Sequence, residues 1–203
     1  MIHVVDYGTG NIGSVINMIR KVGGDVLASG DAQKLVHAEK LLLPGVGSFD
    51  NAMQKLTSLG LPEVIKAKVR TGTPLLGICL GMQLLADGSE EGSLPGLGLI
   101  PGRVRRFAFG PPQGALKIPH MGWNRIKVRK AHPLVNGLDD ASRFYFVHSY
   151  HYECTDEADV LLETSYGYGF ASGIQRENVM GVQFHPEKSH RYGMQLMKNF
   201  VAL

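Results

Sequence analysis

Residues 74–83 read Pro-Leu-Leu-Gly-Ile-Cys-Leu-Gly-Met-Gln, and this stretch decides the fold. Its first half is an apolar run typical of a buried strand, and a helical pattern follows at once. Gly77 and Gly81 stand two residues on either side of Cys79. In a nucleophile elbow, a sharp strand-to-helix turn presents a reactive side chain at the edge of a sheet, and bulk beside it would collide with the turn. The stretch therefore predicts an elbow with Cys79 as the nucleophile.

The residues before the elbow alternate short apolar runs with amphipathic helical patterns. Repeated strand-then-helix units predict an α/β fold, an open and mostly parallel twisted sheet with helices on both faces. The first helix is expected to begin after Asn11, as its N-cap, and to stop before Gly23. The expected strands are 2–5, 25–28, 40–43 and 74–78, and the further expected helices are 50–59, 62–69 and 81–86.

The residue pattern changes in the second half of the chain. Its apolar and polar residues alternate, which predicts antiparallel strands added to the parallel sheet. No repeat, low-complexity tract or linker composition interrupts the chain, so we expect a single domain over 1–203. The expected elements are alternating strands at 104–108, 125–128 and 143–148, a loop at Gly110-Pro111-Pro112, an apolar strand at 179–184 and a closing helix at 192–201.

Composition excludes several classes of function. Hydrophobic residues make up 44% and charged residues 19% of 203, an ordinary globular balance. The net charge of +3 comes from scattered Lys and Arg without a concentrated basic patch, so nucleic-acid binding is not expected. No apolar run reaches the ~20 residues that cross a bilayer, and the N-terminus is no secretory signal. With only two cysteines, we expect a cytoplasmic protein with reduced thiols, no metal and no cofactor.

A thiol nucleophile needs a base, and His185 is the best candidate among the eight histidines. It ends the apolar run 179–184, which places it at a sheet edge, and Pro186 favours extended geometry for it. Residues two apart share a face in an extended chain, so Glu187 is expected beside His185 as the carboxylate that orients the imidazole. The alternative for this His-Pro-Glu segment is a capped turn before the last helix.

A second glycine-containing loop, 43–48, reads Leu-Pro-Gly-Val-Gly-Ser between an expected strand and helix. Its glycines let backbone N–H groups approach a ligand, and it lacks the Lys-Ser/Thr ending of a phosphate-binding P-loop. We expect Gly47 or Val46, together with the N–H of Leu80, to form an oxyanion hole. The alternatives that stay open are a phosphate cradle for the loop and an inert buried thiol for Cys79. Cys154 has neither a glycine frame nor a helix start, and no role is assigned to it.

Three segments together resemble the signatures of the class I (triad) glutamine amidotransferases. They are 44–47 (Pro-Gly-Val-Gly), 77–83 (Gly-Ile-Cys-Leu-Gly-Met-Gln) and 184–187 (Phe-His-Pro-Glu), with 106 residues between nucleophile and base (185 − 79). The resemblance implies a flavodoxin-like fold. It also implies glutamine as substrate, hydrolysed to glutamate and ammonia through a thioester on Cys79, with His185 and Glu187 completing the triad.

Other segments resemble one branch of that family, the glutaminase subunits of imidazole glycerol phosphate synthase. They are 6–11 (Asp-Tyr-Gly-Thr-Gly-Asn), 119–124 (Pro-His-Met-Gly-Trp-Asn) and Lys188-Ser189. This likeness implies a heterodimer with a (β/α)₈ cyclase subunit, which receives the ammonia along an enclosed path. The cyclase product would be imidazole glycerol phosphate, released with aminoimidazole-carboxamide ribonucleotide (AICAR) in histidine biosynthesis.

The same resemblance implies further site residues. Glutamine would be held by Gln83, Glu91, Gly45, Ser149 and Tyr150. For Gln83 the alternative is an exposed helix residue, and for Glu91 a charged loop. The cyclase would dock on Asn11, Met121, Trp123, Tyr145 and Lys188, with the alternative that Trp123 anchors the core instead.

Members of this branch are typically weak glutaminases until the partner and its ligand are bound. Val46 stands between two glycines, so we hypothesise a peptide flip that turns either a carbonyl or an N–H toward the oxyanion position. Three other functions stay open: a subunit of anthranilate or aminodeoxychorismate synthase, a stand-alone cysteine amide hydrolase, and a binding module in which Cys79 is structural.

Overall fold

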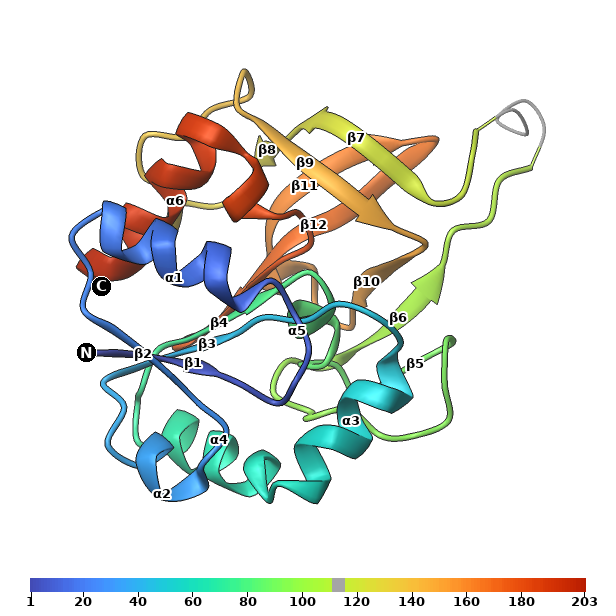
Figure 1. Cartoon of the computed structure of the whole chain (residues 1–203). Helices are drawn as coiled ribbons and strands as arrows, with labels where there is room; N and C mark the ends of the chain where they lie inside the picture. The colour runs from blue at the N-terminus through green and yellow to red at the C-terminus, as the bar shows by residue number, and fades with distance from the viewer. Residues whose placement is uncertain (111–115) are drawn as a thin grey trace.

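The computed structural model describes residues 1–110 and 116–203. Its centre is a sheet whose first five strands all run parallel, in the order β2-β1-β3-β4-β13 (Figure 1). The elbow strand β4 lies between β3 and β13, so the strands that carry the other expected site segments flank it. The bounds are Ile2–Val5 for β1, Val26–Ser29 for β2, Lys40–Leu43 for β3, Leu75–Ile78 for β4 and Val179–Val182 for β13.

Antiparallel strands extend the sheet beyond β13, as expected from the alternating second half. The order continues β12-β10-β6-β5, where the two-residue strand β5 runs parallel to β6, and β11 pairs with β12 and with β8. A separate two-stranded ribbon, β7 with β9, lies beside this extension (Figure 1). The bounds are β5 Gly88–Ser89, β6 Gly102–Arg106, β7 His120–Arg125, β8 Lys127–Val128, β9 Arg143–His148, β10 Tyr150–Cys154, β11 Val160–Tyr166 and β12 Tyr168–Arg176.

Helices cover both faces of the parallel strands. Figure 1 shows α1 and α6 on one side of the sheet and α2, α3 and α4 on the other. The α/β class with a mostly parallel sheet, helices on both faces and antiparallel additions is confirmed. The bounds are α1 Ile12–Lys21, α2 Ala32–Leu35, α3 Phe49–Ser58, α4 Leu61–Arg70, α5 Leu80–Gln83 and α6 His190–Ala202, with short 3₁₀ turns at Pro133–Val135, Glu157–Asp159 and Pro186–Lys188.

Two apolar clusters hold the layers together, one on each face of the sheet. Successive strand residues alternate between them, so that Leu41 and Leu43 pack into one cluster while Leu42 packs into the other. A strand covered on both faces has no exposed side, which is why these strands read as unbroken apolar runs. Burial of that surface, at about 25 cal/mol per Å² of apolar area, fixes the register of the strands that carry the site.

The expected helix at 81–86 is wrong in length, because α5 ends after one turn. The carbonyls of Leu84, Leu85 and Ala86 accept hydrogen bonds from the segment 97–99 instead of continuing the helix. The expected strand at 125–128 is also displaced. The strand β7 ends at Arg125, and the chain then buries Ile126 and crosses to the main sheet as β8.

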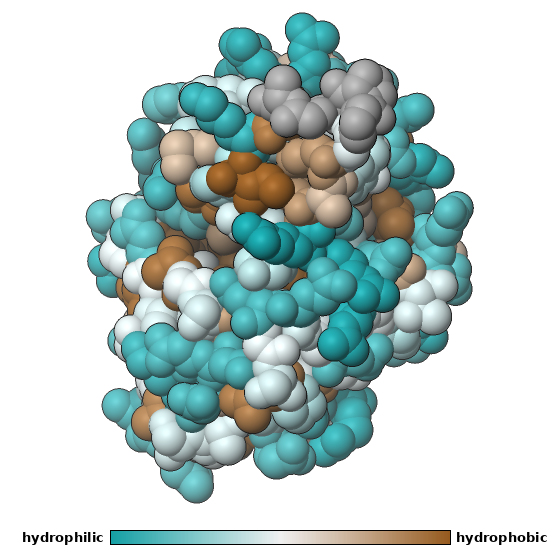
Figure 2. All heavy atoms as spheres, turned by 90° about the vertical axis from the view of Figure 1, so that its right-hand side faces the viewer, coloured by the Kyte–Doolittle hydropathy of each residue, from teal (hydrophilic) through white to brown (hydrophobic). Residues whose placement is uncertain are grey.

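The loop expected at Gly110-Pro111-Pro112 falls, for its two prolines, outside the described residues. Figure 2 shows the face on the right-hand side of Figure 1, which is mostly hydrophilic with an apolar cluster in its upper part. Among the described residues, no helix is both long and apolar enough to cross a membrane.

Candidate active site

Cys79 occupies a strained turn between β4 and α5. Its backbone has φ 55° and ψ −112°, outside the regions that L residues usually adopt, as expected at a nucleophile elbow. A Cβ on Gly77 would lie 2.6 Å from the Gly81 carbonyl oxygen, and one on Gly81 would lie 1.8 Å from that of Leu43. The two glycines are therefore required for the turn to close against β3, as the sequence predicted.

His185 reaches the same edge of the sheet because β13 runs parallel to β4. Val182 pairs with Ile78, and the Cys79 N–H donates to the Val182 carbonyl at 2.8 Å. His185 follows β13 with extended geometry, φ −101° and ψ 97°, as expected before a proline. Its N–H donates to the Tyr145 carbonyl at 2.9 Å, which ties it to β9. The sheet register thus brings together two residues far apart in sequence.

Glu187 lies beside His185, although not for the expected reason. The chain turns into the 3₁₀ segment Pro186–Lys188, so the two side chains meet across a turn rather than along an extended strand. His185 Nδ1 is 2.8 Å from Glu187 Oε1, and both side chains are almost fully buried. Within the described part of the chain the other oxygen, Glu187 Oε2, is buried without a partner, so the imidazole is the group that compensates this carboxylate.

The electrostatics of His185 favour the imidazolium. Burial lowers the pKa of His185, but its interactions with Cys79 and Glu187 outweigh that effect and raise the pKa to about 9. The ring is therefore held in its protonated form at neutral pH when a thiolate and a carboxylate flank it. Since Nδ1 faces Glu187, Nε2 is the ring nitrogen left for the sulfur.

The loop after β3 approaches the elbow closely. The Tyr7 hydroxyl donates to the Pro44 carbonyl at 2.8 Å, and a Cβ on Gly45 would lie 2.9 Å from the Gly81 nitrogen. Gly45 therefore lies behind the elbow, packed against its backbone. Gly47 has φ +101°, and a Cβ there would meet nothing within 4 Å. The end of this loop, in contrast to its start, stands in open space.

A cavity of about 360 Å³ opens onto Cys79 and His185. The predicted residues Val46, Gly47, Leu80, Gln83, Glu91, Ser149 and Tyr150 all line it, and so does Lys188. Gly45 is the one predicted residue of the glutamine site that does not line the cavity.

The two residues expected at the far end of glutamine already hold protein partners. Gln83 is buried, so the exposed-helix alternative is wrong, and its Nε2 donates to the Tyr150 carbonyl and to Gln183. That leaves its Oε1 as the atom able to accept from a ligand. Glu91 accepts the N–H of Phe49 through Oε2 at 2.9 Å and so caps α3. Each side chain is thereby held in one orientation toward the cavity.

The residues expected at a partner surface fall mostly into one cluster. Met121 is 61% exposed and Trp123 47% exposed, both on the outward face of β7, so a core anchor is excluded for Trp123. Trp123 stacks against His190 and meets the Tyr145 ring edge-on at 6.2 Å, and Lys188 Nζ lies 5.7 Å from that ring. Asn11 is exposed at the start of α1, a helix that contacts the segment carrying Lys188.

Sequence reasoning missed four polar residues beside the site: Gln183, His148, His120 and Asn124. Gln183 is fully buried and donates to Cys79 Sγ at 3.8 Å. One signal could have found it, because a glutamine inside the apolar run 179–184 must find hydrogen-bond partners when it is buried. For the other three, only the register of β7 with β9 shows the connection, and no local pattern reveals it.

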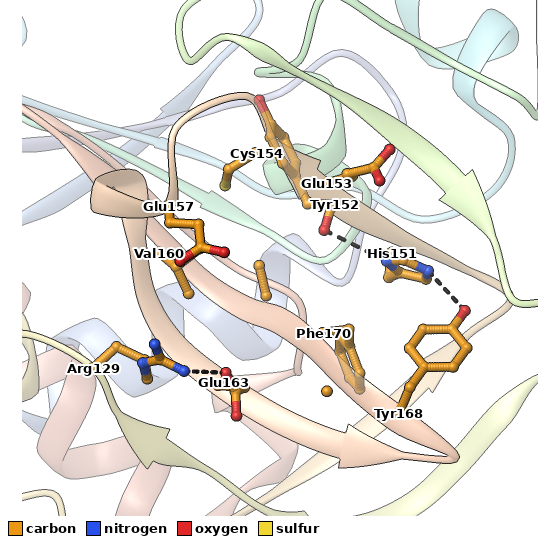
Figure 3. A pocket seen from close by; sticks show the side chains of 12 residues that line it. Arg129, His151, Tyr152, Glu153, Cys154, Glu157, Val160, Glu163, Tyr168 and Phe170 are labelled. Atoms are coloured by element: carbon orange, nitrogen blue, oxygen red, sulfur yellow. Dashed lines mark hydrogen bonds and ion pairs between the residues drawn. The ribbon is translucent and has the colours of Figure 1, made fainter.

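A second cavity, of about 340 Å³, surrounds Cys154 on the antiparallel side of the sheet. Figure 3 shows two pairs of its polar side chains, His151 with Tyr168 on one side and Arg129 with Glu163 on another. Burial, reinforced by the carboxylates of Asp159 and Asp156, raises the pKa of the Cys154 thiol to about 12. Among the described residues, no group of three or more His, Cys, Asp or Glu could hold a metal ion.

An elbow cysteine with a paired histidine and carboxylate at the edge of a parallel sheet is the arrangement of an α/β cysteine amidohydrolase. The family model for glutamine amidotransferase class-I matches residues 3–203, and the chain belongs to this family. It is therefore an enzyme of the glutamine amidotransferase class.

Two relatives with higher sequence identity both carry the name of one branch of this family. The chain is 50% identical over 202 residues to "Imidazole glycerol phosphate synthase subunit HisH 2" of Methanococcus maripaludis, covering 99% of this chain and 98% of the relative. It is 49% identical over 204 residues to the protein of the same name in Pseudomonas aeruginosa, covering 100% of both chains.

Two solved structures share the fold. PurLQS from Thermotoga maritima has a TM-score of 0.75 at 20% identity, covering 99% of this chain and 97% of that one. A glutamine amidotransferase from the same organism has a TM-score of 0.65 at 19% identity, covering 94% of this chain and 77% of that one.

Proposed function

We propose that this chain, as one domain over 1–203, is the glutaminase subunit of imidazole glycerol phosphate synthase. It hydrolyses glutamine to glutamate and ammonia and passes the ammonia to a (β/α)₈ cyclase subunit. The observation that supports this most is the contact of His185 with Glu187, at 2.8 Å, at the sheet edge that also carries Cys79. Full-length relatives named as subunits of that synthase support the choice of branch. The expected compartment is the cytoplasm.

In the first half of the reaction, Cys79 Sγ attacks the side-chain amide carbon of glutamine. The carbonyl oxygen becomes an oxyanion, which the N–H of Leu80 and an N–H at Val46 or Gly47 would stabilise. His185 then gives its Nε2 proton to the departing nitrogen, which leaves as ammonia. A thioester on Cys79 remains. The raised pKa of His185 favours this step, because the ring is still protonated at neutral pH when the nitrogen departs.

In the second half, the neutral His185 acts as a base toward water. Water attacks the thioester carbon, its proton passes to Nε2, and the Cys79 thiolate leaves as glutamate forms. Glu187 keeps Nδ1 of the ring occupied throughout, so the same nitrogen, Nε2, gives and takes the proton. No cofactor or metal is required by these steps, because every proton and electron pair is carried by the named groups.

The residues lining the cavity would hold the amino-acid end of glutamine. Gln83 offers its free Oε1 to the α-ammonium group, and Glu91 contributes a carboxylate at the same end. The cavity segment that includes Ser149 and Tyr150 would contact the α-carboxylate. Gly45 would contribute indirectly, by letting its loop lie against the elbow. These contacts would recognise the free α-ammonium and α-carboxylate groups of glutamine, which a glutamine inside a peptide lacks.

The oxyanion hole would be completed by a peptide flip at Val46. This residue is exposed, and Gly47 beyond it has a positive φ and, as a glycine, a backbone that tolerates the change of φ that a rotation of the peptide between them requires. We expect the isolated chain to hydrolyse glutamine slowly and the cyclase complex to do so at least about tenfold faster. Steady-state kinetics with and without the cyclase measure this directly, and full activity of the isolated chain contradicts it.

The decisive experiment for the function is reconstitution. The chain is mixed with a cyclase subunit, glutamine and the phosphoribulosyl aminoimidazole-carboxamide nucleotide. Formation of imidazole glycerol phosphate and AICAR, coupled one to one with glutamate, is the expected result. Assembly with a chorismate-using synthase instead would assign the chain to the anthranilate or aminodeoxychorismate branch. Rapid hydrolysis of many amides without any partner would assign it to the stand-alone hydrolases.

The docking surface is tested separately. Trp123, with Met121, Tyr145, Lys188 and Asn11, would face the cyclase, and Trp123→Ala is expected to weaken that complex by about tenfold or more in Kd, because exposed aromatic anchors dominate interface energies. Leu59→Ala is the matched control, since Leu59 is 44% exposed and lies at the end of α3, away from β7. Equal Kd values for the two variants, measured by calorimetry, would place the interface elsewhere.

A further inference from the structure

The sulfur of Cys79 has a second polar neighbour besides the triad. Gln183 is the residue after β13, is fully buried, and donates from Nε2 to Cys79 Sγ at 3.8 Å. Its Oε1 accepts from Gln83 Nε2 at 2.9 Å, and Gln83 donates again, to the Tyr150 carbonyl at 3.1 Å. The nucleophile is thus tied, through two glutamine side chains, to the start of β10.

The same carbonyl receives a second chain of hydrogen bonds from β7. His148 Nδ1 is 2.7 Å from the Tyr150 oxygen, and His148 Nε2 is 3.0 Å from His120 Nδ1. His120 Nε2 is in turn 3.2 Å from Asn124 Nδ2. Six hydrogen bonds therefore run without interruption from Asn124 to Cys79 Sγ.

The direction of every bond in this chain is fixed by groups with one possible role. The Tyr150 carbonyl can only accept, so His148 Nδ1 donates and Gln83 presents its NH₂ group. A neutral His148 then accepts at Nε2, so His120 donates from Nδ1 and accepts at Nε2 from Asn124. The orientation of Asn124 is set independently, because its Nδ2 donates to the Ser165 carbonyl at 2.9 Å and its Oδ1 accepts from the Arg125 N–H at 2.8 Å.

Burial keeps both imidazoles neutral, as that pattern requires. It lowers the pKa of His120 to about 4 and, with a smaller effect of neighbouring histidines, that of His148 to about 3. His120 lies between the rings of Phe146 and Tyr166, with centroids at 4.8 and 4.1 Å. A ring enclosed in this way holds a single tautomer and a single position.

We propose that this hydrogen-bonded chain positions the Cys79 sulfur, with Gln183 as the positioning residue at the nucleophile and Asn124 as the far end of the chain. The inference rests on the proposed function of Cys79. Asn124 is half-buried on β7, and its neighbours Met121 and Trp123 point outward from the same strand. A change in β7 on docking would therefore reach the sulfur through side chains that the triad mechanism does not use.

Gln183→Glu is the sharpest test at the nucleophile. It keeps the side-chain shape and the acceptor for Gln83, but it places an oxygen where the N–H faced the sulfur. We expect kcat for glutamine in the cyclase complex to fall about 10- to 100-fold, the range for a hydrogen bond to a charged group, with KM changed less than about twofold. The pH dependence of the alkylation rate of Cys79 by iodoacetamide should also shift to higher pH. Gln183→Met removes both the donor to the sulfur and the acceptor for Gln83 without adding charge, and it should shift both readouts in the same direction.

Tyr152→Phe is the control for the loss of one buried hydrogen bond. The Tyr152 hydroxyl donates to the Ile100 carbonyl, a bond that is not one of the six between Asn124 and Cys79, and this variant should leave kcat and the alkylation profile unchanged. If Gln183 had a merely structural role, Gln183→Glu and Tyr152→Phe would both lower the thermal stability. Both variants would then keep the alkylation profile of the wild type.

The far end is tested by Asn124→Leu against Asn199→Leu. Both asparagines are half-buried and each donates twice, but Asn199 donates to the Leu134 and Asn136 carbonyls, outside the chain. We expect Asn124→Leu alone to lower kcat about three- to tenfold and to shift the alkylation profile, with the Kd for the cyclase unchanged.

Wild-type kinetics and a wild-type alkylation profile in Gln183→Glu would overturn the proposal, as would identical behaviour of the two asparagine variants. The alkylation readout uses the chain without its partner or glutamine, so it tests the positioning chain even if the complex shows no glutaminase activity. In that case the proposed function fails while the positioning of the sulfur is still decided.

Discussion

The two cysteines of this protein stand in cavities of similar size and have different surroundings. Cys79 lies on a strained turn where β4, β13 and the loop after β3 meet, beside an imidazole whose pKa is raised to about 9. Cys154 lies on the antiparallel extension, where burial and nearby carboxylates raise the pKa of its thiol to about 12. A cavity and a thiol are common to both sites.

The difference shows which neighbours the fold supplies to one thiol and not to the other. Near Cys79, neighbouring parallel strands end at one edge, so His185 and the glycine-containing loop after β3 line the same cavity as the thiol. Near Cys154, the histidine that lines the cavity, His151, is bonded to Tyr168, and the arginine that lines it, Arg129, is paired with Glu163. The topology of the sheet therefore gives Cys79, and not Cys154, the neighbours that the proposed reaction requires.

The largest expected effect separates the two thiols directly. Cys79→Ala should lower glutamine turnover in the cyclase complex by about 10⁴-fold or more, because the covalent pathway is lost. Cys154→Ala should leave turnover within about twofold of the wild type. Steady-state glutamate release measures both variants, and a comparable loss in the second would end the distinction.

Removing the charge on Glu187 comes next. Glu187→Gln keeps the shape of the side chain but no longer compensates the imidazolium, so kcat should fall about 10²- to 10³-fold with little change in KM. Glu163→Gln is the matched control in the second cavity, where Glu163 pairs with Arg129. Similar kcat values for the two variants would show that Glu187 has no part in the reaction.

Alkylation should also discriminate between the sites. With its pKa raised to about 12, Cys154 is almost wholly protonated at pH 8, and its rate should rise about tenfold per pH unit. We expect iodoacetamide at pH 8 to modify Cys79 at least about a hundredfold faster than Cys154, followed by peptide mass spectrometry. Equal rates at this pH would contradict the assigned environments.

The smallest expected effect concerns stability in acid. The folded-state pKa values of His120 and His148 lie near 4 and 3, below 6.5, so the unfolded chain takes up protons first as the pH falls. Stability is therefore complete above pH 6.5 and is lost toward pH 4, by up to about 1.4 kcal/mol per pH unit for each histidine. His120→Phe should flatten this slope in urea unfolding, whereas a change at the exposed His37 should not. Parallel slopes would refute the account.

Much of the parallel half could be predicted from sequence alone. Apolar runs that are buried on both faces mark β1, β3 and β4 almost residue by residue, because no solvent face interrupts them. The antiparallel half was harder. Strands β10 to β12 mix exposed and buried residues with bulges, and β7 contains two half-exposed polar or glycine positions, so alternation alone does not give their limits.

The residues of the site also fall into two groups, those with a local sequence signal and those without one. The Cys79 elbow carries a local signal in its glycine frame, and the pair His185–Glu187 carries one in its His-Pro-Glu segment, although the expected extended geometry is a turn in the structure. Gln183, His148 and Asn124 matter through contacts between strands, which only the register of the folded sheet defines. The candidate reacting groups therefore follow from the sequence, while the side chains proposed to position them required the structure.

The most direct test of the account labels the protein with 6-diazo-5-oxo-norleucine, a glutamine-like electrophile, in the presence of the cyclase. The expected result is one adduct, on Cys79, whose formation glutamine slows by competition and which abolishes turnover. Cys154 should stay unmodified in the same sample. An unmodified Cys79 in the partner-bound protein, or an adduct on any other residue, would contradict the claim that this elbow thiol attacks glutamine.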